Sequence, residues 1–246
     1  MPATLLDSTG HRGETEYEFN LLAEYLQVSE AAIPAAEEAA HAQLQEAVSA
    51  MENEDELFFA ASRFRDQAGR YRREFPLRLR YGFLIQLYTL LEDRARSLCQ
   101  VIADREDLGQ IQLRDQNRIG FIYVFRDWIS ENTDGSSTRW DFANSLRIIR
   151  NCVAHANGRI DGDQNPQRLR ETIQDVPGVE EDQFGYIALS RSYCDQAYEQ
   201  IIGLFDDVYS TTRFGASFFF AHRQPREIGV VIDQSGESPK FKVLGE

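Results

Sequence analysis

The stretch from Pro76 to Ala103, PLRLRYGFLIQLYTLLEDRARSLCQVIA, constrains the fold more than any other part of the sequence. Apolar residues recur there at helical spacing, at Leu84, Leu87, Leu91, Leu98 and Ile102. More apolar residues lie around them, so the helix is apolar on more than one side. Such a helix has to be covered by other elements, and we expect it at the centre of a bundle, with Pro76 in its first turn.

Helical patterns on both sides of this segment predict the rest of an all-α fold. Before it, we expect helices over residues 14–30, 34–52 and 54–74, with Pro34 interrupting the first pair. After it, we expect helices over 118–130, from Ser137 or Thr138 to Ala156, and over 190–212. Residues 159–186 are polar and predict a loop-rich connection. The chain then divides into an acidic helical N-terminal extension (1–53), a helical bundle (54–214), and a C-terminal extension (215–246) that forms a tail or a β-hairpin.

The charge is unevenly distributed along the chain. Residues 1–60 hold thirteen acids and one base, whereas the remaining residues account for only −2 of the net charge of −14. This balance argues against a general nucleic-acid coat. Of the 26 basic residues 24 are arginine, whose planar fork of donors suits phosphate. The arginine-rich segment 63–80 either pairs with the acidic N-terminal helices or forms a track for an RNA backbone.

Cysteine usage and hydropathy suggest a location. Cys99, Cys152 and Cys194 lie far apart and form no CxxC pair, which favours a reducing compartment and buried thiols. No run reaches the ~18 apolar residues of a membrane span. The first residues show no basic head followed by an apolar run, so we predict no signal peptide, no membrane partner and a cytoplasmic protein.

A group of polar residues ends the helix before Asn157-Gly158, in the sequence RNCVAHANG (150–158). At about 100° per residue, Arg150 and His155 lie about 140° apart, and Asn151 lies between them. Arg147 falls on the same side, while the opposite side is apolar. Polar groups on a half-buried helix need partners. Asn157-Gly158 predicts a helix C-cap.

The pattern Arg-Asn-x-x-x-His on a late helix of an α-bundle resembles the motif of the HEPN superfamily, and the pair Leu91-Glu92 resembles a feature of its earlier core helix. The resemblance covers roughly residues 76–212. It implies a four- or five-helix bundle and a homodimer in which two motifs face each other across one composite cleft. It also implies metal-independent cleavage of an RNA substrate, without a cofactor. Some members act as toxins or anti-phage effectors, so it further implies a protein inhibitor or antitoxin as partner.

The resemblance assigns catalytic roles to Arg150, Asn151 and His155, and the chemistry of these residue types supports it. Histidine titrates near neutral pH and accepts the proton of a 2′-hydroxyl, while arginine holds a phosphate as charge builds. Asn151 either orients His155 or binds the phosphate. We place Arg147, Arg159 and Glu92 beside them as candidate substrate-binding residues. The expected products carry a 2′,3′-cyclic phosphate and a 5′-hydroxyl. We expect no metal, because one histidine without a cysteine or carboxylate cluster is a poor ligand set.

Other interpretations of these residues stay open. A histidine at a helix C-terminus is favoured by the helix dipole, and an Arg-Asn pair can cap a neighbouring loop. Glu92 can pair with Arg96 one turn later. The chain can also be a non-catalytic HEPN-like module that binds RNA, a nucleotide or a protein and acts by dimerisation. The acidic residues 1–52 are a candidate restraint on activity, through occupation of a basic surface.

Overall fold

The computed structural model describes residues 4–49, 51, 53–105, 121–133 and 137–211. Contacts divide these residues into two compact units. The bundle unit contains residues 4–23 and 80–211, and the hairpin unit contains residues 24–79. The sequence-based boundary at residue 53 therefore falls inside the hairpin unit, and the boundary at 214 lies outside the described residues.

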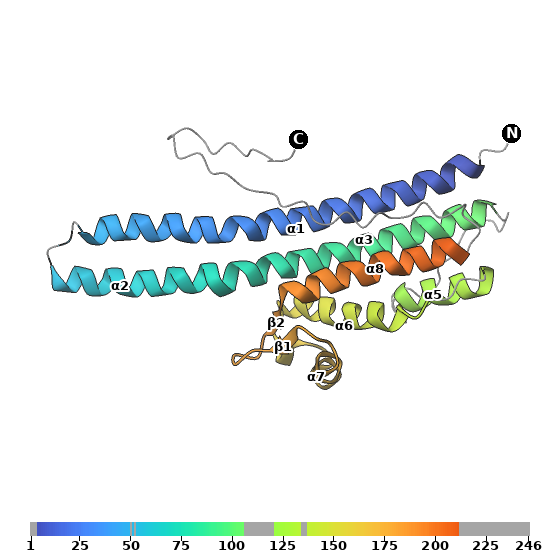
Figure 1. Ribbon diagram of the computed structural model, residues 1–246. Coiled ribbons are helices and arrows are strands. Elements are labelled where there is room, and N and C mark those ends of the chain that lie inside the picture. Colours follow the sequence, from blue (N-terminus) through green and yellow to red (C-terminus); the bar gives the residue numbers. More distant parts are fainter. Residues whose placement is uncertain (1–3, 50, 52, 106–120, 134–136, 212–246) are drawn as a thin grey trace. The chain divides into compact units, whose positions relative to one another are not determined.

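The described residues form an all-α fold with one small sheet, as the sequence predicts (Figure 1). The strands β1 and β2 are antiparallel, with Val179 opposite Leu189 and Glu181 opposite Ile187. The elements in chain order are α1 (Thr4–Ser49), α2 (Glu54–Gly69), a π-helical turn (Arg70–Glu74), α3 (Phe75–Arg105), α5 (Phe121–Asn132), α6 (Trp140–Ala156), a 3-10 turn (Ile160–Gly162), α7 (Pro166–Gln174), β1 (Val179–Glu181), β2 (Ile187–Leu189) and α8 (Arg191–Thr211).

Helix α3 is the buried helix that its apolar pattern predicts. Each of the five predicted core residues on it is at most 2% exposed: Leu84, Leu87, Leu91, Leu98 and Ile102. Pro76 lies in its first turn, also as predicted. The preceding π-helical turn widens the helix where the proline ring would otherwise meet the carbonyl group four residues earlier. The chain therefore enters α3 from α2 without a loop.

The first part of α1 packs in the bundle unit rather than outside it. Phe19 is fully buried, and its ring lies 5.7 Å from that of Phe205 on α8. The contacts of His11 with Tyr209 and of Asn20 with Tyr198 show that α1 and α8 run antiparallel. A deletion of residues 1–52 would therefore remove core side chains, and it does not isolate an acidic restraint.

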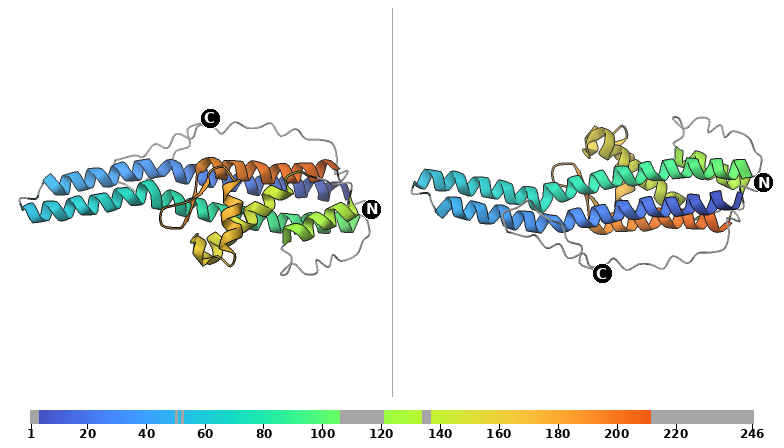
Figure 2. Two further views of the ribbon diagram at one scale, coloured as in Figure 1. Left: turned by 90° about the horizontal axis from the view of Figure 1, so that it is seen from below. Right: turned by 90° about the horizontal axis from the view of Figure 1, so that it is seen from above.

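The hairpin unit consists mainly of the second part of α1 and of α2, which lie side by side (Figure 2). Arg72 donates to Glu37 at 2.7 Å, and the rings of His41 and Phe64 lie 4.8 Å apart. These contacts show that the two helices are antiparallel. The Arg72–Glu37 pair supports the first interpretation of the arginine-rich segment, in which it pairs with the acidic helices.

The predicted interruption at Pro34 is wrong, because α1 continues through this residue from Thr4 to Ser49. Pro34 is exposed, so water can hydrate the carbonyl group that loses its N–H partner. The alanine- and glutamate-rich residues around it have high helix propensity. Local propensity and solvation together outweigh the cost of one proline.

The loop-rich connection predicted over 159–186 is more regular than its composition suggests. It contains a 3-10 turn, helix α7 and the first strand of the sheet. Asn165 caps α7 by accepting from the backbone N–H of Arg168, and Pro166 occupies the first turn. Leu169 and Ile173 are buried on one side of α7. The β-hairpin predicted after residue 215 lies outside the described residues.

Candidate functional site

The polar residues of RNCVAHANG stand on a firmly terminated helix, as the Asn157-Gly158 cap predicts. Asn157 adopts the left-handed conformation with φ of 54°, and Gly158 has φ of 80°. The backbone N–H groups of both residues donate to the carbonyl oxygen of Cys152. These bonds satisfy the free carbonyl end of α6 and fix the direction in which the chain leaves it.

Helix α3 and the β-hairpin hold this helix end in place. A Cβ atom at Gly158 would lie 2.1 Å from the Tyr81 hydroxyl oxygen, so only glycine fits there. The Tyr81 hydroxyl donates to the carbonyl group of Ile187, and the Ile187 N–H donates to the carbonyl group of Gly158. Three segments distant in sequence therefore meet at the end of the motif.

Arg150 and Asn151 interact directly with each other. Arg150 Nη1 donates to Asn151 Oδ1 at 3.2 Å. The Arg150 guanidinium carbon lies 5.3 Å from the centre of the Tyr88 ring, within range of a cation–π interaction. Arg150 Nε is buried and has no hydrogen-bond partner among the described residues. The guanidinium is thus stacked on α3 with part of its hydrogen-bonding capacity unused.

Tyr88 gathers several of the predicted site residues around one hydroxyl group. It is 1% exposed, and its hydroxyl has no partner among the described residues. Burial raises the pKa of Tyr88, and the carboxylate of Glu92 raises it further, while Arg147 and Arg150 act in the opposite direction. The sequence analysis missed Tyr88, although it lies one turn before Glu92 on the same face of α3.

Arg147 lies beside a second tyrosine, on α5. Its guanidinium carbon is 5.8 Å from the centre of the Tyr123 ring, and that of Arg126 is 5.2 Å from the same ring. Arg147 also donates to Asn144 Oδ1 at 3.1 Å. Arg126 and Tyr123 continue this surface on α5, where Arg126 is also paired with Asp127 at 2.7 Å. Neither residue was a sequence-predicted site residue.

His155 and Arg159 are exposed and stand apart from this cluster. Within the described residues, the side chain of His155 makes no hydrogen bond or ion pair. Asn151 Oδ1 accepts from Arg150, so in this structure the asparagine is not hydrogen-bonded to the histidine. The backbone of Arg159 bridges to Tyr186 and leads into the 3-10 turn. The structure therefore places the Arg150 guanidinium over the Tyr88 ring, with Asn151 hydrogen-bonded to Arg150. Arg147 and Glu92 lie within electrostatic range of Tyr88, and His155 and Arg159 are exposed to solvent.

Cys152 is a packed thiol, as predicted from its side of the helix. It is fully buried, and Sγ lies 3.5 Å from the carbonyl oxygen of Arg159. Burial raises the pKa of this thiol to about 12, with a smaller contribution from the charge of Asp163. A thiol that stays protonated at neutral pH is a poor nucleophile.

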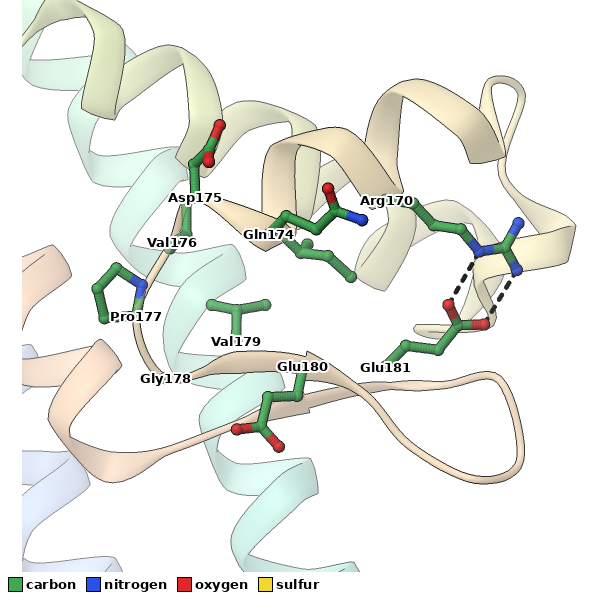
Figure 3. Close-up of a pocket in the computed structure, with 10 residues that line it drawn as sticks. Arg170, Gln174, Asp175, Val176, Pro177, Gly178, Val179, Glu180 and Glu181 are labelled. Carbon is green, nitrogen blue, oxygen red and sulfur yellow. Dashed lines mark hydrogen bonds and ion pairs between the residues drawn. The ribbon is translucent and has the colours of Figure 1, made fainter.

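A separate hollow of about 510 Å³ lies between α7 and β1 (Figure 3). Arg170 and Glu181 form an ion pair at its rim, and Ile173, Val176 and Val179 supply apolar lining. None of the predicted site residues contributes to its wall. The hollow is therefore distinct from the cluster around Tyr88.

The fold and site define an all-α protein whose bundle carries an arginine- and asparagine-bearing helix end stacked against a buried tyrosine. Comparison with known proteins found no matching family model, no matching curated protein and no matching solved structure. In the described parts of the chain, no helix combines the length and apolarity needed to cross a bilayer.

Proposed function

We propose that this protein is a metal-independent endoribonuclease of HEPN type. One observation carries the proposal. Arg150 and Asn151 are hydrogen-bonded to each other on the rigidly capped end of α6, and His155 is exposed one turn later on the same helix. This arrangement supplies a cation for phosphate and an accessible proton acceptor on one stiff element.

In the proposed reaction the RNA supplies its own nucleophile. The 2′-oxygen attacks phosphorus, its proton passes to His155, and the bond between phosphorus and the 5′-oxygen breaks. Arg150 binds the phosphate oxygens while negative charge builds on them. A proton must also reach the departing 5′-oxygen, from water or from His155 of a second copy. The products are a 2′,3′-cyclic phosphate and a 5′-hydroxyl, and no metal takes part.

The environment of Arg150 fits an anion-binding role. Asn151 and the Tyr88 ring orient the guanidinium, which leaves other donors for a ligand. Arg147 and Arg126 add positive charge along the neighbouring surface, where the next phosphates of an RNA strand would lie. Glu92 balances part of this charge near Tyr88. We place the RNA strand over α6 and α5 on these grounds.

The test is cleavage of a mixed RNA pool in the presence of EDTA, comparing the wild type with His155→Ala. His155 is exposed, so the substitution should not disturb folding. Loss of a general base lowers the rate by about 10²–10⁴-fold. We expect EDTA-resistant cleavage that leaves cyclic phosphate ends in the wild type only.

His41→Ala is the matched control, because His41 belongs to the hairpin unit and the motif belongs to the bundle unit. This variant should cleave like the wild type. If the folded wild type cleaves no RNA, or if His155→Ala cleaves as fast, the proposed activity is wrong. Circular dichroism of each variant shows whether it is folded.

The second candidate is a non-catalytic module that binds RNA, a nucleotide or a protein partner and acts by dimerisation. It is favoured by the fact that Asn151 bonds to Arg150, while the side chain of His155 makes no hydrogen bond or ion pair among the described residues. In that case RNA binding, measured by fluorescence anisotropy, would fall in Arg150→Ala and be unchanged in His155→Ala. No cleavage would be seen with either protein.

A further inference from the structure

The hairpin unit buries very little apolar surface of its own. Among its described side chains, only Leu26 and Ala60 are buried. Two helices that pack along one seam cover only one side of each helix. Five large apolar residues remain exposed on this unit: Tyr25 (51%), Leu57 (36%), Phe58 (73%), Phe59 (65%) and Phe75 (44%). Exposed aromatic groups of this kind mark interaction surfaces.

We propose that the hairpin unit docks onto the same unit of a second copy of this chain, forming a four-helix assembly. The contact face consists of Phe59 and Arg63 on α2, of Arg70 at the start of the π-helical turn, and of α1 around Ala47. The proposal uses residues 24–79 only and does not depend on the proposed ribonuclease activity. It names an interface different from the composite cleft implied by the HEPN resemblance.

The spacing of residues on α2 defines the docking face. Phe59, Arg63 and Arg70 follow one another at four and seven residues, so they lie on one side of the helix. All three are exposed. The ring of Phe58 touches that of Phe59, with centres 6.1 Å apart, but Phe58 leaves the helix about 100° away. Phe59 is therefore the aromatic anchor of this face.

The register of the hairpin sets which residues lie at the same level. The pairs Glu37–Arg72 and His41–Phe64 fix the alignment of the antiparallel helices. Continued toward the tip from the His41–Phe64 contact, this alignment places Glu46 and Ala47 level with Phe59, and Arg63 about one helical turn away, level with Ala42. Glu46, Ala47 and Arg63 are all exposed. Neither Glu46 nor Arg63 forms an ion pair with another described residue.

A two-fold axis parallel to the helices of the hairpin places α1 of each copy over α2 of the other copy. Rotation about this axis does not change the position of a residue along it. The small side chain of Ala47 then makes room for the partner's Phe59. Glu46 lies about one turn from the partner's Arg63, within reach of that long side chain. Each contact occurs twice, as in any isologous dimer. Large rings over small side chains give the close packing that a stable interface needs.

The distribution of charge favours a second copy of this chain as the partner of the docking face. Residues 24–49 contain five glutamates and no lysine or arginine, whereas residues 63–73 contain five arginines and one aspartate. The unit is thus complementary to itself when α1 meets α2 of the partner. A face about 39 Å long and about 20 Å wide has about 800 Å², the area that each partner contributes to a standard interface.

The first test is the mass of the full chain in sedimentation experiments over a range of concentrations. We expect twice the 28.2 kDa of one chain at tens of micromolar for the wild type. Phe59→Ser should raise the dimer dissociation constant by about tenfold or more, because it removes the central anchor. Phe58→Ser is the matched control on the other side of the same helix, and it should have a smaller effect. Phe184→Ser, at an exposed residue of the bundle unit, should have none.

The second test exchanges charges across the interface. Glu46→Arg and Arg63→Glu should each weaken the homodimer, because each brings like charges within about one helical turn of one another across the interface. A mixture of the two variants should form a heterodimer with nearly wild-type affinity, because opposite charges face each other again. Both residues are exposed, so each variant should keep the wild-type fold, which circular dichroism checks.

Three results would overturn the inference. A wild-type chain that stays monomeric at these concentrations has no such interface. A dimer that is insensitive to Phe59→Ser and to both charge variants uses another surface. A larger effect of Phe58→Ser than of Phe59→Ser places the interface on the opposite side of α2. These variants leave Arg150 and His155 intact. The mass measurement therefore tests the dimer, and the RNA cleavage assay tests the proposed ribonuclease activity, independently of each other.

Discussion

The bundle unit and the hairpin unit are both helical, but they differ in how their helices are covered. In the bundle unit, α3 contacts elements on several sides, and its five predicted core residues, four leucines and one isoleucine, are nearly inaccessible to water. In the hairpin unit, the second part of α1 and α2 share one seam, and two of the described side chains are buried. Helix propensity is high in both, so propensity does not account for the difference.

The difference shows what holds each unit together. The bundle unit is stabilised by apolar burial that depends on close packing. The hairpin unit is stabilised by local helix propensity and exposed ion pairs, and a partner docked on its outer face would add to this. Helix α1 belongs to both units, so its first part is stabilised by apolar burial and its second part by helix propensity and exposed ion pairs. Substitutions at matched residue types in the two units test this contrast.

The largest effect is expected for a buried aromatic residue. Phe19→Ala should lower the free energy of unfolding by about 3–5 kcal/mol, because Phe19 is fully buried against Phe205. Phe58→Ala in the hairpin unit should change it by about 0.5 kcal/mol or less, because Phe58 is 73% exposed. Urea denaturation followed by circular dichroism measures both values. Similar losses in the two variants would mean that the units do not differ in burial as described.

The next effect concerns two glycines. Gly158→Ala should destabilise the protein by about 3 kcal/mol, because φ is 80° and the added Cβ meets the Tyr81 hydroxyl. Gly69→Ala in the hairpin unit should stabilise it by up to about 1 kcal/mol, because Gly69 is helical with open space around it. Thermal unfolding of the two variants gives the comparison. A stable Gly158→Ala protein would contradict the role assigned to the α6 cap.

A smaller effect is expected from pH, through His11 in the bundle unit. His11 is 5% exposed, and its Nδ1 lies 2.9 Å from the hydroxyl oxygen of Tyr209. Burial and the charge of Arg94 lower the pKa of His11, while the carboxylates of Glu14 and Asp93 raise it by less. The unfolded chain therefore binds a proton at a higher pH than the folded protein does. The contribution of neutral His11 to stability is fully present above about pH 6.5 and is lost as pH falls through the folded-state pKa.

The expected loss is at most about 1.4 kcal/mol per pH unit for this one group. Urea denaturation at about pH 7 and about pH 5 measures it in the wild type, in His11→Gln and in His41→Gln. The slope should become smaller in His11→Gln only. Equal slopes in the wild type and His11→Gln would show that another group controls acid stability.

The smallest effects are expected for ion pairs. Arg94 is 14% exposed and pairs with Glu18 at 2.8 Å, so Glu18→Gln should cost about 1 kcal/mol. Arg72 is 74% exposed and pairs with Glu37, so Glu37→Gln should cost about 0.5 kcal/mol or less. The Glu37→Gln effect should also disappear in high salt. An equal or larger cost for Glu37→Gln would contradict the solvent-exposed character of the hairpin unit.

Several elements follow from the sequence because their signals are local. The period of apolar residues in α3 and α8, and the Asn157-Gly158 cap of α6, depend on residues within one or two turns. The regular structure after residue 159 was harder to predict, because strands β1 and β2 have only three residues each and show no alternating pattern. They form because Gly158 and Tyr81 bind the backbone of Ile187, a contact across distant segments.

The residues of the candidate site also differ in whether the sequence alone identifies them. Arg150, Asn151 and His155 stand out in the sequence, because rare polar types occur together on a short helical stretch. Tyr88 and Tyr123 do not stand out, because an aromatic residue on an amphipathic helix usually signals core packing. Their role depends on which arginines lie over their rings, and those arginines come from other helices or later turns.

By itself the sequence determined most of the helices, the end of α6, the division of charge and the polar residues of the motif, because periodicity and capping act over a few residues. Only the tertiary structure decided that the first part of α1 lies in the bundle core, that Pro34 lies within a continuous helix and that Arg150 stacks on Tyr88. An apolar face indicates that another element must cover the helix, but it does not indicate which element does so. That choice depends on the packing of all the helices together.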